Sequence, residues 1–204
     1  INAFNMTDGI DGLAGMLSLV SFITLAIFMT LWGQQLYASL ALVIAIALLP
    51  YLACNLNLIP GRRIFMGDAG SMLIGLSVIW LLIIGTQSET ASFRPVTALW
   101  IIAIPLMDMI AIMVRRIRKG QSPFQADREH LHHQLQDVGH SHQGAVMVFY
   151  HWTALVSISL LLFFWLDWPQ VMVIFGFWLI LALVHTYWPV FKRRYKFRKA
   201  LRGK

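Results

Sequence analysis

Residues 36–55 read LYASLALVIAIALLPYLACN and contain no Asp, Glu, Lys or Arg. A helix of about 20 apolar residues is long enough to cross the hydrocarbon core of a bilayer. Only a helix satisfies the backbone polar groups of such a segment in lipid, because an open strand would leave them unpaired. This stretch therefore predicts a transmembrane helix and sets the pattern for reading the rest of the chain.

Five further stretches share this length and low polarity. The six predicted membrane spans are Leu13–Trp32, Leu36–Asn55, Ala69–Thr86, Val96–Val114, Ala145–Leu166 and Gln170–Phe191. The composition agrees with this interpretation, since 58% of the 204 residues are hydrophobic and only 12% are charged. Soluble domains contain about 25% charged residues. We therefore expect an all-α, polytopic transmembrane helix bundle with six spans.

The connections between these stretches alternate in charge. Fifteen of the sixteen Lys and Arg residues lie in the segments 1–12, 56–68, 115–144 and 192–204, and only Arg94 lies elsewhere. The positive-inside rule places such basic segments in the cytoplasm. The net charge of +7 also suggests nucleic acid as a partner class, but the apolar composition favours the membrane explanation. We expect no nucleic-acid partner.

Acidic residues stand directly before two of the apolar stretches, on the predicted cytoplasmic side. Asp8 and Asp11 belong to NMTDGIDG at 5–12, and their spacing of three would place them on one face of a helical turn. Asp68 ends the stretch FMGD, where a helix N-terminus favours an anion. Such carboxylates are usually functional, and together they suit Mg²⁺. The structural alternative is helix capping, by Thr7 or Asp8 before the first span and by Asp68 before the third.

The segment 115–144 combines basic and imidazole side chains. Arg116 lies near its start, and His130, His132 and His133 lie near its middle. Such a set suits a phosphate-rich, metal-bound substrate, although topology alone would also explain the arginine. A zinc site at the histidines is a weaker alternative, since no Cys lies close to them in the sequence.

Three signatures, in this order, resemble the polyprenyl-phosphate N-acetylhexosamine-1-phosphate transferase family. They are Asn-Xaa-Xaa-Asp-Gly-Ile-Asp-Gly at 5–12, Phe-Met-Gly-Asp at 65–68 and His-Leu-His-His at 130–133. The third signature looks most like the enterobacterial members that start O-antigen and enterobacterial common antigen synthesis. Members that initiate teichoic-acid synthesis stay open as an alternative. A membrane transporter is the alternative from a different class, but it would need its polar residues near the bilayer midplane.

The resemblance implies transfer of N-acetylglucosamine 1-phosphate from UDP-N-acetylglucosamine to undecaprenyl phosphate, with UMP as the leaving group. It implies Mg²⁺, or Mn²⁺ in its place, held by Asp68 and Asp11, with Asp8 and Asp11 as catalytic residues. Phe65 would stack on uracil, and either Asn55 or Asn57 would read the same base. The substrate-binding residues that the resemblance implies are Asn5, Phe65, Arg116, His130, His132 and His133.

The resemblance also implies that residues 1–204 form the C-terminal part of one integral-membrane transferase domain. Family members carry an Asp-Asp pair before the first signature, and no such pair occurs in this sequence. We therefore expect a missing N-terminal part and membrane lipid as partners of this chain, and a homodimer stays open. The expected location is the bacterial inner membrane, with several spans and a cytoplasmic active site.

Overall fold

The computed structural model describes residues 1–9, 11–87, 91–122 and 141–162, and every regular element within these ranges is an α-helix. Three of the helices, α2, α3 and α4, are long and apolar enough to cross a membrane. They confirm the first three predicted spans and, for the described residues, the all-α fold class. The helices are α1 (Asn2–Thr7), α2 (Leu13–Leu31), α3 (Gln35–Asn55), α4 (Gly67–Gln87), α5 (Pro95–Ile101), α6 (Ala103–Arg118) and α8 (His142–Leu162).

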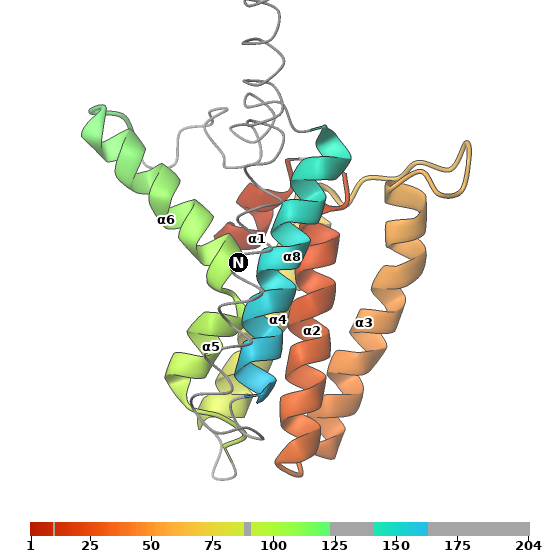
Figure 1. Ribbon diagram of the computed structural model, residues 1–204, viewed down its shortest axis with the longest axis vertical. Helices are drawn as coiled ribbons and strands as arrows, with labels where there is room; N and C mark the ends of the chain where they lie inside the picture. Colours follow the sequence, from red (N-terminus) through yellow and green to blue (C-terminus); the bar gives the residue numbers. More distant parts are fainter. Residues whose placement is uncertain (10, 88–90, 123–140, 163–204) are drawn as a thin grey trace, which may run out of the picture.

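The long helices run in alternating directions, so the described connections fall at two ends of the bundle (Figure 1). One end carries α1, the turn before α2, the connection 56–66, the C-terminal end of α6 and the start of α8. The opposite end carries the α2–α3 turn and the start of α5. The described parts of the basic segments are thus gathered at one end, which we call the basic end.

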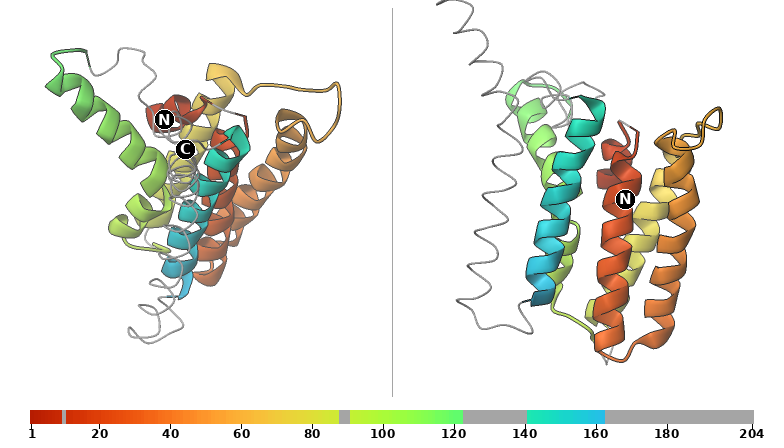
Figure 2. Two further views of the ribbon diagram at one scale, coloured as in Figure 1. Left: turned by 45° about the horizontal axis from the view of Figure 1, so that its top comes forward. Right: turned by 45° about the vertical axis from the view of Figure 1, so that its right-hand side comes forward.

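Helix α2 lies at the centre of the bundle, where it packs against α3, α4 and α8 (Figure 2). Its buried hydroxyl groups donate to carbonyl groups one turn earlier, as Ser18 does to Ala14 at 2.6 Å, so they need no water. Apolar side chains on the outer faces of α3 and α4, such as Val43 and Leu73, are exposed. This distribution is expected when lipid covers the outer helices.

The fourth predicted span, Val96–Val114, is not one continuous helix, because the chain breaks between α5 and α6 at Ile102. Pro105 has no N–H to donate to the carbonyl of Ile101. The hydroxyl of Ser21 on α2 donates to that carbonyl instead, at 3.3 Å. A proline break is tolerated in a membrane bundle when a neighbouring helix supplies the missing hydrogen bond.

The last two predicted spans are described only in part. Helix α8 overlaps the predicted span Ala145–Leu166, and the described residues end at 162. The sixth span, Gln170–Phe191, and the basic tail 192–204 lie outside the described residues, so both stay predictions.

Candidate active site

The first acidic signature forms a turn between two helices. Helix α1 ends at Thr7, Asp8 follows it, and α2 begins at Leu13 after Gly12, whose φ is 81°. Glycine adopts this left-handed conformation without steric strain. The expectation that Asp8 and Asp11 share one helical turn is therefore wrong. Gly12 occupies the N-cap position of α2, so neither Thr7 nor Asp8 caps the first span.

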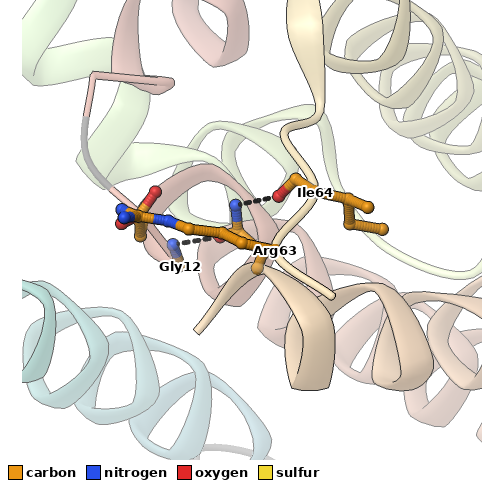
Figure 3. A network of polar contacts seen from close by, with 5 residues as sticks. Gly12, Arg63 and Ile64 are labelled. Atoms are coloured by element: carbon orange, nitrogen blue, oxygen red, sulfur yellow. Dashed lines mark hydrogen bonds and ion pairs between the residues drawn. The ribbon is translucent and has the colours of Figure 1, made fainter. Parts of the chain in front are cut away.

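Asn55 joins this turn to the connection between α3 and α4 (Figure 3). It is the last residue of α3 and is only 3% exposed. Its side-chain oxygen accepts a hydrogen bond from the backbone N–H of Gly12, and its side-chain nitrogen donates to the carbonyl of Ile64 at 2.8 Å. We call this arrangement of Gly12, Asn55 and Ile64 the Asn55 clamp. It holds the segments of the first two signatures together.

An ion pair connects the residues next to the clamp. The guanidinium of Arg63 lies against the carboxylate of Asp11, with the two side chains 52% and 30% exposed. The same guanidinium lies 5.3 Å from the centroid of the Phe65 ring. An exposed ion pair of this kind adds little stability, about 0–1 kcal/mol. Its larger effect is on charge, because Arg63 neutralises Asp11.

Asp8 interacts with the second signature. Burial raises the pKa of the Asp8 carboxyl, and the negative charge of Asp68 raises it further. Asp68 is exposed and lies in the first turn of α4. Neighbouring carboxylates repel each other, and a divalent cation relieves that repulsion.

Mg²⁺ in enzymes is typically held by one or two carboxylates together with substrate phosphates and water. Asp8 and Asp68 supply two carboxylates for such a set, and their binding of a metal ion stays a prediction. Within the described ranges, no group of three or more His, Cys, Asp and Glu side chains gathers in a way that could hold a metal ion. Asp8 and Asp68 are two carboxylates whose charges interact, while Asp11 is held by Arg63.

Asn5 organises the same region from α1. Its side-chain oxygen accepts a hydrogen bond of 2.6 Å from the hydroxyl of Ser71, which is fully buried on α4. Because Ser71 lies one turn after Asp68, this bond ties α1 to the start of α4. Asn5 thus has a positioning role in the fold. The substrate contact that the resemblance implies for it stays a prediction.

A cavity of about 900 Å³ opens beside the Asn55 clamp and the ion pair of Arg63 and Asp11. Its wall comes from the turn before α2, the end of α3, the connection 56–66 and the start of α8. Asp11, Asn57 and Arg63 supply polar atoms, and Phe65 supplies an aromatic face. Gly9, the residue after Asp8, also lines the cavity, whereas Asp8 and Asp68 are not among the lining residues. Sites for small molecules and cofactors commonly enclose about 300–1,000 Å³, so this cavity has the size of a site for a nucleotide-like ligand.

Residues 1–86, which contain the first two signatures and the Asn55 clamp, match the family model described as glycosyl transferase family 4. The chain is also 55% identical, over 166 residues, to the undecaprenyl-phosphate alpha-N-acetylglucosaminyl 1-phosphate transferase of Escherichia coli (strain K12). The chain belongs to glycosyl transferase family 4. This E. coli member is aligned over 79% of the present chain and 44% of its own length.

Other bacterial proteins with the same name give a similar result. The relative from Salmonella typhi is 53% identical over 72% of this chain and 41% of its own length. The relative from Haemophilus influenzae is 47% identical over 66% of this chain and 38% of its own length. The chain thus spans less than half the length of these curated relatives. No solved structure matches it.

Of the remaining predicted site residues of this family member, only one lies in the wall of the cavity among the residues that the structure describes. Phe65 is 71% exposed and lines the cavity, which is compatible with base stacking. Arg116 is 2% exposed near the C-terminal end of α6 and is not among the residues that line the cavity. Its phosphate contact stays a prediction. His130, His132 and His133 lie outside the described residues, so their substrate contacts also stay predictions.

Two features of this family site were not predicted from the sequence. The charge pattern assigns Arg63 only to the topology signal, although its position two residues before Phe65 in a non-helical stretch suggests a shared face. Asn55 was considered only as a reader of uracil. Because its amide oxygen and nitrogen are both used by the clamp, the exposed Asn57 is the better placed of the two to contact a ligand.

Proposed function

We propose that this chain is part of an Mg²⁺-dependent transferase that moves N-acetylglucosamine 1-phosphate from UDP-N-acetylglucosamine to undecaprenyl phosphate and releases UMP. The observation that supports this most is the cavity at the basic end, whose wall brings Asp11 of the first signature together with Arg63 and Phe65 of the connection 56–66. The shared name of the relatives supports undecaprenyl phosphate as the acceptor and N-acetylglucosamine 1-phosphate as the transferred group. The family resemblance supports UDP as the nucleotide of the donor. A site at one end of the spans also favours a transferase over a transporter, whose site would lie near the midplane.

The chemistry requires charge neutralisation, because both substrates carry anionic phosphate groups. In the proposed reaction, an oxygen of the lipid phosphate attacks the phosphorus that bears the sugar, and the bond from that phosphorus to UMP breaks. Mg²⁺, or Mn²⁺ in its place, would neutralise the diphosphate and the leaving group when bound. Asp8 and Asp68 would hold the ion. The lipid phosphate is already ionised near neutral pH, so direct attack needs no strong base, and Phe65 would hold the uracil ring.

The proposed location is the bacterial inner membrane with the basic end in the cytoplasm, where nucleotide sugars are made. The product would be the first lipid-linked intermediate of a surface polysaccharide such as O-antigen or enterobacterial common antigen. Full-length protein in membranes is expected to transfer radiolabel from UDP-N-acetylglucosamine into an organic-solvent extract only when undecaprenyl phosphate is present. EDTA should stop this transfer, and added Mg²⁺ or Mn²⁺ should restore it. Correctly inserted protein that forms no labelled lipid would contradict the proposed activity.

The proposed orientation makes a separate prediction about accessibility. Ser141 and Gln35 are exposed at opposite ends of the bundle, so each can carry a single cysteine in a Cys54→Ser background. Ser141→Cys is expected to react with a membrane-impermeant thiol reagent only after the inner membrane is permeabilised. Gln35→Cys should react when only the outer membrane is opened. The reverse pattern would show that the basic end faces the periplasm.

A further inference from the structure

Arg63 has a fixed backbone and an exposed tip. The Asn55 clamp holds the carbonyl of Ile64, the next residue. The side chain of Arg63 is nevertheless 52% exposed, and it lines the cavity. A side chain anchored at its base and open at its end is suited to contact a ligand, because little of the local backbone must be ordered when the ligand binds.

The charge distribution of the cavity points to an anionic ligand at this position. Among the described residues that line the cavity, only Arg63 and Asp11 are formally charged. They are paired with each other, so that Asp11 is neutralised and the guanidinium is occupied. An anion that reached Arg63 would therefore compete with the carboxylate of Asp11.

The two possible partners of Arg63 differ in strength. An exposed pair with a carboxylate contributes about 0–1 kcal/mol. A guanidinium can form two parallel, charge-assisted hydrogen bonds to a phosphate, and such bonds are about twice as strong as neutral ones. A diphosphate that carries more than one negative charge is thus able to displace Asp11.

The neighbouring ring indicates which diphosphate fits. The Arg63 guanidinium lies 5.3 Å from the centroid of the Phe65 ring, which is itself 71% exposed in the cavity wall. A base stacked on Phe65 would carry its phosphates into the region of the guanidinium. The juxtaposition therefore suits a nucleoside diphosphate more than an isolated lipid phosphate.

We propose that Arg63 binds the diphosphate of the nucleotide donor by exchanging its partner Asp11 for a phosphate group. This inference rests on the proposed function and adds a residue and an order of events to it. Asp11 stays neutralised by Arg63 until the nucleotide arrives. The exchange then frees the Asp11 carboxylate for the metal-binding or catalytic role that the family resemblance implies.

Equilibrium binding tests the exchange separately from catalysis. Full-length protein in detergent, with EDTA present, is titrated with UDP-N-acetylglucosamine and with uridine in a calorimeter. Arg63→Ala is expected to weaken binding of the nucleotide sugar roughly 10- to 150-fold, the range for loss of one charge-assisted contact. Binding of uridine, which has no phosphate, should stay within about twofold of the parent. Arg62→Ala, the matched control, removes an adjacent exposed charge that is not part of the cavity wall and should change neither affinity.

A second variant tests the competition itself. Asp11→Asn removes the charge that holds Arg63, so metal-free binding of UDP-N-acetylglucosamine should tighten up to about fivefold, which corresponds to the strength of an exposed pair. Unchanged nucleotide-sugar affinity in Arg63→Ala, an equal loss for uridine, or weaker binding in Asp11→Asn would overturn the exchange. A parent protein that binds neither ligand would instead contradict the proposed function.

Discussion

Replacing Asp68 with Asn is expected to lower kcat/KM for transfer at least about 100-fold, while the protein still inserts and purifies normally. The substitution keeps the size of the side chain and one oxygen, but it removes the negative charge at the start of α4. If a divalent cation lies between Asp68 and Asp8, this change removes a ligand and weakens neutralisation of the diphosphate. Asp8→Asn should have a comparable effect, because the two carboxylates interact.

The measurement is steady-state transfer with Mg²⁺ varied, in membranes that contain matched amounts of protein. Loss of a metal ligand should raise the Mg²⁺ concentration needed for half-maximal rate about tenfold or more, besides lowering the maximum. Glu89→Gln is the control, since this carboxylate lies in the predicted periplasmic connection and should not affect either quantity. Near-normal transfer by Asp68→Asn would remove Asp68 from the metal site. A low maximum with an unchanged Mg²⁺ requirement would assign it a different role.

The spans were predictable because the bilayer imposes one simple condition on the sequence. A stretch of about 20 residues without charge has to be helical in lipid, and α2, α3 and α4 lie within two residues of the predicted limits. The break at Ile102 was visible in part, since Pro105 removes one hydrogen bond from the helix. The hydrogen bond from Ser21 that stabilises the break could not be predicted from the sequence, because it joins residues 80 positions apart.

The site shows the same division between local and long-range information. The spacing of Asp8 and Asp11 suggested one helical turn, but Gly12 adopts a left-handed conformation that ends the helical path between α1 and α2. The sequence supplied the carboxylates as chemical candidates, and their catalytic and metal-binding roles stay predictions. It could not supply their partners, because the pairing of Asp11 with Arg63 and of Asp8 with Asp68 depends on how the turn and the connection 56–66 dock.

The docking itself depends on Asn55, and its replacement gives the second large expected effect. Asn55→Leu has a similar size but leaves the N–H of Gly12 and the carbonyl of Ile64 without their partner. The N–H of Gly12 is buried, and one buried polar group left unsatisfied costs about 1–3 kcal/mol, whereas Ile64 is 45% exposed and water can reach it. The substitution should therefore destabilise the basic end by about 1–3 kcal/mol. We expect a lower thermal midpoint in detergent and a loss of transfer together. Asn55→Asp should fall between, because it keeps the acceptor for Gly12 and loses the donor to Ile64.

Asn57 provides the matched control, because loss of its side-chain amide should lower ligand affinity, whereas loss of the Asn55 amide should lower stability. Its φ is 56°, a conformation that glycine accepts, so Asn57→Gly removes the exposed amide without straining the backbone. This variant should keep the thermal midpoint of the parent and lose only affinity for the uridine nucleotide. Asn55→Leu should lose stability, and the backbone amide of Gly12 should exchange its hydrogen faster. If Asn55→Leu instead kept its stability and lost only uridine affinity, Asn55 would be the residue that reads the base, and the clamp would not be what joins the two segments.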